Sequence, residues 1–438
     1  MTAGLRDELS SRLSGMQEAF ASALGVKGAN DRVDALTRFC RDLLRSSSLC
    51  LIDGAVHYFD GRIYSPAPDV RTDLADLLVD RGASPLDVRR MGDMPLSVIG
   101  EKCLAPSDAL AFRNCIYDLS AGRKRAFGPE WVCTDLLPYD YSPSARCPRF
   151  SAFLDEVLPD ACEQAAMLEF FSLSLLDRKG VSVEKMALFI GEGANGKSVV
   201  FDVVRAVLGG RVSSLDPAQL ADDKMTPYLN GARINLAPDV KRSSAFESAL
   251  KALSSGQAVT GRRIFHDAEQ VCAPPLAFAM NDLPAFRDPS NAFFRRLLVF
   301  PFDVTIPEER QDKTLAATII SSELPGVMNL LLKALSDLRA RRFDFHPTEK
   351  MRSRLEAIRG LSREEDSPVR AFLAKRGLSP TPAFPGQEGR RISQSEIVSA
   401  LKERLSPTAV TRELRSFGVE VHRGREERYY IVYPIQKK

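Results

Sequence analysis

The sequence predicts an α/β fold, in which a buried parallel strand leads into a glycine-rich loop and a helix. A mainly helical segment precedes this core and a winged-helix unit follows it. Residues 186–190 are continuously apolar, which fits a strand buried on both faces. From residue 198 the apolar residues recur at helical spacing until Gly209 and Gly210 end the pattern. Residues 391–435 read as helix, helix, strand, strand, which is the order expected of a winged helix.

The loop between this strand and helix has the spacing of a phosphate-binding loop. The pattern G-x-x-x-x-G-K-S is met by Gly191, Gly196, Lys197 and Ser198. These glycines and Gly193 let backbone N–H groups approach the β- and γ-phosphates of a nucleotide, where the helix N-terminus adds a favourable dipole. Lys197 supplies a positive charge and Ser198 a hydroxyl for Mg²⁺. A chance glycine-rich turn is the alternative, and the strand-loop-helix context disfavours it.

The composition is that of an ordinary globular protein. With 438 residues, 44% of them hydrophobic, the chain can form two or three domains. No apolar stretch reaches the length of a bilayer span and the N-terminus lacks an apolar signal core, so we expect a cytoplasmic protein with no membrane partner. Eight scattered cysteines without a C-x-x-C pair predict reduced thiols and no zinc site. The net charge of +3 is too small to predict nucleic-acid binding by itself.

We expect three domains. The first, residues 1–149, combines α and β segments and is mainly helical, with apolar residues at three- and four-residue steps up to about residue 46. The second, residues 150–340, contains the phosphate loop. The third, residues 341–438, starts with charged helical sequence and holds the winged helix. Residues 386–438 contain eleven Lys or Arg against seven Asp or Glu, so basic charge collects in this last domain.

Two polar residues follow predicted strands after the loop. Residues 231–240 include an alternating apolar stretch that ends near Asp239, where a carboxylate would hold Mg²⁺ through water and polarise the attacking water. Residues 276–286 predict a strand ending at Asn281, whose amide could contact the γ-phosphate and the attacking water. An ordinary turn Asp and an Asn before a Pro turn are the alternatives.

Arg295 and Arg296 lie between aromatic residues and an apolar strand. A guanidinium offered to the γ-phosphate of a neighbouring subunit would act as an arginine finger, which contributes several orders of magnitude in rate. A structural salt bridge is the plain alternative for both arginines.

Residues 251–271 predict a basic hairpin. Residues 259–264 can pair with residues 268–271, which places a basic and aromatic group near the tip. This group comprises Arg262, Arg263, Phe265 and His266. The arginines suit contacts with phosphates and Phe265 suits stacking on a base, although a solvated basic hairpin would have the same sequence.

Together these residues resemble superfamily 3 helicases of the phage, plasmid and poxvirus primase-helicase type, whose core is an AAA+-like P-loop ATPase. The resemblance covers about residues 50–320. It rests on Asn195 before Gly196, on Lys251 and Gly256 as K-x-x-x-x-G, on Asn281 to Pro284 as N-x-x-P, and on Arg295-Arg296-Leu297 followed by Pro301-Phe302. Upstream, A-F-R-N-C-I-Y-D-L and C-P-R-F-x-x-F-L resemble the helical domain that precedes the ATPase in this family.

The sequence departs from the family pattern in three places. Asp239 follows Pro238 where the family usually has Glu, so its carboxylate is one methylene shorter. Asn114-Cys115 replaces the usual Asn-Gly. We see no primase domain with paired catalytic acids, so priming would need a separate primase or initiator.

The resemblance implies a homo-hexameric ring that binds ATP and Mg²⁺ between subunits. Lys197, Ser198, Asp239 and Asn281 would come from one protomer and Arg296 from the next, with Arg295 as the second candidate finger. The hairpin, with Lys251 before it, would draw single-stranded DNA through the pore. The winged helix would bind duplex DNA through Arg412 and Arg415. The alternative is that both arginines are solvent-exposed charges of a helix. We therefore expect a replicative DNA helicase of a mobile element or phage; the alternative is an ATP-switched DNA-binding initiator that does not unwind processively.

Overall fold

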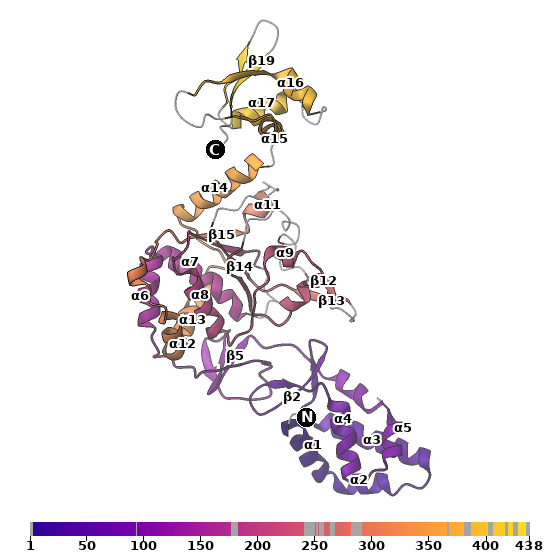
Figure 1. The fold of residues 1–438 in the computed structure, drawn as a ribbon. Coiled ribbons are helices and arrows are strands. Elements are labelled where there is room, and N and C mark those ends of the chain that lie inside the picture. The colour runs from indigo at the N-terminus through magenta and orange to yellow at the C-terminus, as the bar shows by residue number, and fades with distance from the viewer. Residues whose placement is uncertain are drawn as a thin grey trace.

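The computed structural model describes residues 3–434 except residues 93, 177–182, 241–249, 251–252, 254–257, 263–267, 282–290, 366–367, 381–386, 402–405, 417–418 and 424–427. The molecule is elongated, with a helical N-terminal part, a central α/β core and a small C-terminal unit that follows α14 (Glu349–Glu365) (Figure 1). Among the described helices, none alone is long and apolar enough to cross a bilayer. The bent pair Glu308–Ser322 and Leu324–Ala340, at 77° to each other, meets the length and composition criteria only jointly.

Helices dominate the first hundred residues, as predicted. They pack around one apolar cluster and are α1 (Ala3–Gly15), α2 (Gln17–Leu24), α3 (Ala29–Ser46), α4 (Val70–Asp80), α5 (Pro85–Met91) and the 3₁₀ helix η1 (Met94–Glu101). A four-stranded sheet in the order β3-β2-β1-β4 joins them, with strands β1 (Cys50–Ile52), β2 (Ala55–Phe59), β3 (Tyr64–Pro66) and β4 (Cys103–Leu104). The left-handed conformations of Asp53 and Gly54 form the tight turn between β1 and β2.

A second sheet bridges the N-terminal part and the core. Its order is β7-β6-β5-β8, from strands β5 (Ala109–Phe112), β6 (Cys115–Asp118), β7 (Arg123–Arg125) and β8 (Leu136–Leu137). Asn114, in the β5–β6 turn, donates to the Tyr141 carbonyl (3.0 Å) and accepts from its N–H (2.9 Å). The apolar cluster of the core includes Leu110 and Phe112 and extends to Met351, so it crosses the predicted boundary at residue 149. The domain boundaries stay predictions.

The core is a sheet of five parallel strands in the order β10-β11-β14-β9-β15. The strands are β9 (Met186–Ile190), β10 (Val212–Ser213), β11 (Ile234–Ala237), β14 (Leu276–Met280) and β15 (Leu297–Pro301). The predicted strands at residues 186–190, 234–237 and 276–280 are therefore confirmed. After β9 the chain continues to β10 at one edge of the sheet, whereas after the neighbouring strand β14 it continues to β15 at the opposite edge. Two adjacent strands whose connections run in opposite directions mark the switch point of an open α/β sheet, where ligands bind beyond the carboxyl ends of the strands.

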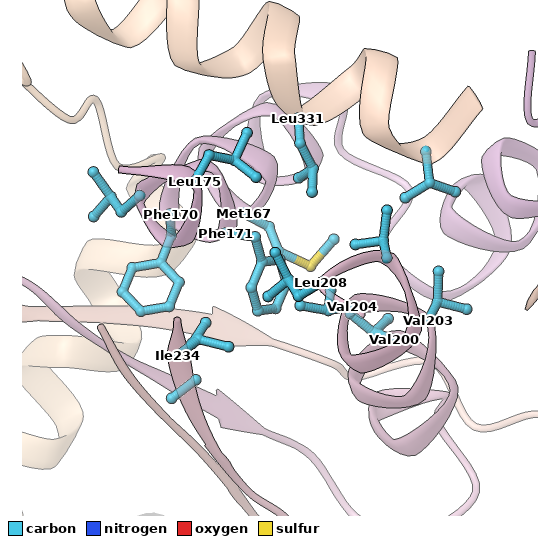
Figure 2. Packing of buried hydrophobic residues seen from close by; sticks show 14 of the residues in the cluster. Met167, Phe170, Phe171, Leu175, Val200, Val203, Val204, Leu208, Ile234 and Leu331 are labelled. Atoms are coloured by element: carbon cyan, nitrogen blue, oxygen red, sulfur yellow. The ribbon is translucent and has the colours of Figure 1, made fainter. Parts of the chain in front are cut away.

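Helices cover both faces of this sheet. Ala187 and Phe189 of β9 face one apolar cluster, while Met186, Leu188 and Ile190 face the other, as the two-residue repeat of a strand requires. In the first cluster, Met167, Phe170 and Phe171 pack with Val200, Val203, Val204, Ile234 and Leu331 (Figure 2). The helices of this layer include α6 (Pro148–Val157), α7 (Ala161–Ser172), α8 (Lys197–Val207), α12 (Leu315–Ser322) and α13 (Leu324–Ala340). The strand-loop-helix order predicted around the glycine-rich loop is confirmed.

The opposite face carries shorter elements and α14. They include α9 (Pro217–Leu220), the 3₁₀ helix η4 (Thr226–Leu229), α11 (Asn291–Phe294) and the antiparallel hairpin of β12 (Ala258–Arg262) and β13 (Ala268–Cys272). Helix α14 is tied to the segment after β15, because Asp303 accepts hydrogen bonds from Arg354 (2.7 Å) and lies 3.0 Å from Lys350. Burial opposes ionisation of Asp303, but these two cations prevail and lower its pKa.

The C-terminal unit has its own apolar cluster. It contains α15 (Pro368–Lys375), β16 (Leu378–Ser379), β17 (Arg390–Ser393), α16 (Gln394–Ala400), α17 (Pro407–Ser416), β18 (His422–Arg423) and β19 (Arg428–Pro434). The predicted order helix, helix, strand, strand is present as α16, α17, β18 and β19, and Ser393 caps α16 by accepting from the Glu396 N–H (3.1 Å). Strand β17 adds to this sheet and was not predicted.

Candidate functional site

The glycine-rich loop lies beyond the carboxyl end of β9, between β14 and β15. Strand β9 brings it there, and the loop ends where α8 begins at Lys197. The Phe302 N–H donates to the Ile190 carbonyl (2.7 Å) and the Ile306 N–H to the Ala194 carbonyl (2.8 Å). The segment after β15 therefore forms one wall of the loop.

Glycine is required at two loop positions for different reasons. Gly196 has φ of 82°, a left-handed conformation that glycine adopts at little cost. A Cβ on Gly191 would lie 2.0 Å from the Phe302 carbonyl oxygen and 2.4 Å from the Asn195 amide nitrogen. In contrast, a Cβ on Gly193 would meet nothing within 4 Å. The two outer glycines thus shape the loop, while Gly193 faces open space.

The Lys197 side chain is only 7% exposed and points back into the loop. Its ammonium donates to the Gly191 carbonyl, to Asn195 Oδ1 at 3.0 Å and to Asn281 Oδ1 at 3.5 Å. Burial lowers the pKa of Lys197, and the Asp239 carboxylate partly offsets that effect. The cation is therefore held in place by neutral oxygen atoms, which leaves its charge available to an anion.

The loop backbone is suited to bind phosphate. Within the described part of the chain, no acceptor receives a hydrogen bond from the backbone N–H groups of residues 193–199. These groups precede and open α8, a helix of eleven residues, where the positive end of the helix dipole lies. Free amides, a buried ammonium and a helix N-terminus together fit the phosphates of a nucleotide.

Asn281 and Asp239 meet beside Lys197, although 42 residues separate them. Asn281 follows β14 and Asp239 follows β11, so neighbouring parallel strands deliver both to one edge of the sheet. Asn281 Nδ2 lies 3.4 Å from Asp239 Oδ1. Asp239 has φ of 52°, a left-handed conformation that Asp tolerates better than most residues. The structure thus brings together three residues predicted for one site.

Mg²⁺ would find oxygen donors at the same edge. Ser198, the second residue of α8, and Asp239 are both exposed. The described residues contain no group of three or more His, Cys, Asp or Glu that could hold a metal. Mg²⁺ needs only one or two protein ligands when substrate phosphates and water complete its shell, so a hydroxyl and a carboxylate fit this cation.

Arg295 and Arg296 lie at the other end of the sheet. They precede β15, and the Met186 N–H at the start of β9 donates to the Arg296 carbonyl (2.8 Å). Both guanidinium groups contact Glu184 Oε2, at 3.0 Å for Arg295 and 3.2 Å for Arg296. Burial opposes ionisation of Glu184, but the two arginines prevail and lower its pKa. Arg295 is 65% exposed and Arg296 13%, so Arg295 is the side chain that can reach another molecule.

The predicted hairpin exists, but its tip lies outside the described residues. Strands β12 and β13 pair from Ala258 with Cys272 to Arg262 with Ala268. Lys251, Arg263, Phe265 and His266 all lie outside the described residues. Arg262 is exposed at the end of β12, and its N–H donates to the Asp223 carbonyl (3.0 Å).

Sequence reasoning missed two features of the site. Tyr228 in η4 is 61% exposed, and η4 packs against the hairpin through Gly261, whose Cβ would lie 2.8 Å from Pro227. The Asn195 amide also crosses the loop to donate to the Phe302 carbonyl at 3.2 Å. The Pro301-Phe302 motif was a signal in the sequence for the contact between Asn195 and Phe302. An isolated tyrosine such as Tyr228 gives no such signal.

Arg412 and Arg415 are both exposed on α17. The opposite side of this helix carries Val410 and Leu414, which are buried in the apolar cluster of the C-terminal unit. The structure thus places both predicted arginines on the outer face of α17.

Two family models match parts of the chain. Residues 87–159 match the model described as D5 N terminal like, and residues 189–296 match that of a family of unknown function, DUF5906. The first match spans both upstream motifs, and the second runs from β9 to Arg296. Each covers less than half of the chain.

Two viral proteins and two solved structures are similar to this chain. "Putative helicase L207/L206" of Acanthamoeba polyphaga mimivirus is 25% identical over 51% of this chain and 26% of its own length. "Putative helicase 184R" of Invertebrate iridescent virus 6 is 27% identical over 47% and 24%. The apo structure of the NrS-1 C terminal region has a TM-score of 0.49 at 10% identity, and its A form 0.46 at 11%, each covering 91% of this chain and 99% of that chain.

The matches cover about a quarter of the length of these two viral relatives. The D5 N terminal match and the names of the relatives support, at modest identity, a relationship to replication proteins of the helicase or primase-helicase type.

Proposed function

We propose that this protein is an ATP-dependent replicative DNA helicase of the superfamily 3 type, with an AAA+-like P-loop core and a C-terminal winged helix. One observation carries the proposal: the buried Lys197 ammonium lies beside Asn281 and Asp239, among loop amides that have no acceptor in the part of the chain that the structure describes. The viral relatives that are named as helicases point to the same class.

Each residue at the sheet edge has a role in this proposal. The amides of residues 193–199 and Lys197 bind the phosphates of ATP, and Gly191, Gly193 and Gly196 allow the close approach. Ser198 and Asp239 would hold Mg²⁺, which would neutralise part of the charge of the phosphates. Asp239 also accepts a hydrogen bond from the attacking water, and Asn281 orients that water relative to the γ-phosphate.

The positions of the arginines support a ring. A strand of five residues spans about 16 Å, and Arg295 and Arg296 precede β15 whereas Lys197 follows β9. Neither guanidinium can reach the loop of its own chain without dismantling the sheet. If either residue is an arginine finger, it would act on the loop of an adjacent copy, and we propose that six copies form the ring. Exposure favours Arg295 over Arg296, the reverse of the order expected from sequence.

DNA contacts follow from the same arrangement. The hairpin, with Arg262 at the end of β12 and with Arg263, Phe265 and His266 in the sequence between its two strands, would hold single-stranded DNA, as would Lys251 before it. Tyr228 beside it adds an exposed ring. Arg412 and Arg415 on α17 would contact duplex DNA. A separate primase or initiator would supply priming.

Hydrolysis and strand displacement test the proposal together. Lys197→Ala should abolish ATP turnover, whereas Lys333→Ala, an exposed lysine of α13, should not. On a forked DNA duplex, the wild-type protein should displace one strand with ATP but not with a non-hydrolysable ATP analogue, which would support the helicase proposal. ATP-dependent DNA binding without release would support the initiator alternative. Normal turnover by Lys197→Ala would exclude both.

Mixing experiments test the shared site. Arg295→Ala and Lys197→Ala proteins are each expected to be inactive alone. Mixed rings should recover part of the ATPase activity, because some interfaces combine the intact lysine with the intact arginine. Absence of any recovery in rings shown by mass analysis to be mixed would contradict a finger supplied by the neighbouring subunit.

A further inference from the structure

The outer face of the C-terminal sheet carries a row of aromatic and cationic side chains. Strand β19 is central, with β17 on one side and β18 and β16 on the other. Its buried residues Tyr430 and Val432 face the apolar cluster, so Tyr429 faces the other way. The register places His422 of β18 directly opposite Tyr429, and Arg391 of β17 diagonally across from it.

These three side chains stack as one layer. The Arg391 guanidinium lies 4.8 Å from the centre of the Tyr429 ring. The His422 ring is stacked on Tyr429 with centres 5.2 Å apart and planes 16° from parallel. Because β17 and β18 flank β19 on opposite sides, Arg391 and His422 approach Tyr429 from opposite sides. Planar cationic and aromatic groups in this arrangement are the groups on which proteins stack unpaired bases.

The helices of the unit leave this row accessible. Helices α15, α16 and α17 contribute Val369, Leu373, Ile397, Val410 and Leu414 to the cluster on the inner face. Arg391 is exposed, and Tyr429 and His422 are partly exposed. Arg390 and Arg428 are also exposed on the same strands, and residues 386–438 carry a surplus of four positive charges. The surroundings thus complement a phosphate backbone.

We propose that Arg391, Tyr429 and His422 form a binding surface for single-stranded DNA, separate from α17 and from the hairpin. An unpaired base displaces the exposed Arg391 guanidinium from one face of the Tyr429 ring and stacks there, Arg391 then contacts a neighbouring phosphate, and His422 stays stacked on the opposite face and holds the ring in position. A paired duplex hides the faces of its bases, so the surface prefers single strands. The inference does not depend on ATP hydrolysis.

The test uses the full chain without nucleotide, so that failure of the ATPase proposal does not affect it. A labelled oligothymidine, followed by fluorescence anisotropy, should bind Tyr429→Leu about tenfold more weakly than wild type because the stacked ring is lost. Tyr429→Phe keeps the ring and should bind normally. Arg391→Gln should reduce the slope of log affinity against log salt by about one, whereas Lys375→Gln on α15 should not change it.

Photo-crosslinking locates the contact. An oligonucleotide with 5-iododeoxyuridine should crosslink to the peptide that contains Tyr429 in wild type and in Tyr429→Phe, and the crosslink should be lost in Tyr429→Leu. Absence of this crosslink in wild type, or equal single-strand affinity of Arg391→Gln and Lys375→Gln, would overturn the proposal. An equal loss of duplex and single-strand binding in Arg391→Gln would also overturn it. If Tyr429→Leu unfolds the unit, Arg391→Gln and the wild-type crosslink still decide the question.

Discussion

Replacing Asn195 by alanine tests whether this side chain organises the phosphate loop. Its amide nitrogen donates to the carbonyls of Glu192 and Phe302, and its oxygen accepts from the Lys197 ammonium at 3.0 Å. Asn195 is buried, so the loop cannot replace these bonds with water without rearranging. Hydrogen bonds to charged groups contribute about 1.5–3 kcal/mol. If this orientation of Lys197 is required for binding, ATP affinity should fall about ten- to hundredfold.

Asn329→Ala is the matched control. Asn329 is partly buried and, like Asn195, donates to two carbonyls, those of Ser142 (2.9 Å) and Ala145 (3.0 Å), but it lies on α13 away from the loop. Titration of each variant with a fluorescent ATP analogue measures affinity, and circular dichroism confirms the fold. Asn195→Ala should bind weakly while Asn329→Ala binds as wild type. Equal affinity of the two variants would refute the reasoning.

Two further predictions concern stability and thiol chemistry. Gly196→Ala should lower the free energy of unfolding by about 2–4 kcal/mol, because φ of 82° is costly for alanine and its Cβ would lie 2.6 Å from the Phe153 ring. Gly193→Ala should be nearly neutral in the same thermal unfolding assay without nucleotide, and a similar loss in both would count against this account. Burial raises the pKa of Cys40 to about 12, so this thiol should resist iodoacetamide at pH 8 while the exposed Cys162 reacts; mass spectrometry of the labelled peptides checks this. The raised pKa of Cys40 favours the folded state below pH 9, and this contribution to stability is lost as the pH rises from 9 to 12.

The convergence of Lys197, Asp239 and Asn281 could be predicted because it needs little tertiary information. Each residue follows an apolar stretch, and the carboxyl ends of parallel strands share one edge of a sheet. The structure adds the strand order, which places Asp239 and Asn281 beside the loop rather than farther along the edge.

The arrangement of the arginines could not be predicted from sequence. Arg295 and Arg296 are neighbours in the sequence, which does not distinguish them. Their packing beside Glu184 leaves the Arg295 side chain exposed and the Arg296 side chain largely buried. The bond from Asn195 to Phe302 joins residues 107 apart. Strand β17 was missed because Arg390-Arg391-Ile392-Ser393 contains a single apolar residue, so the two-residue repeat gives no signal.

Residues 302–306 link two parts of the molecule. Phe302 and Ile306 of this segment form hydrogen bonds with the glycine-rich loop. Asp303 forms ion pairs with Lys350 and Arg354 in the first half of α14. Helix α14 has seventeen residues, so it forms an arm of about 25 Å that ends beside the C-terminal unit. The segment that bonds to the phosphate loop is thus also the segment that holds the first half of the helix leading to the C-terminal unit.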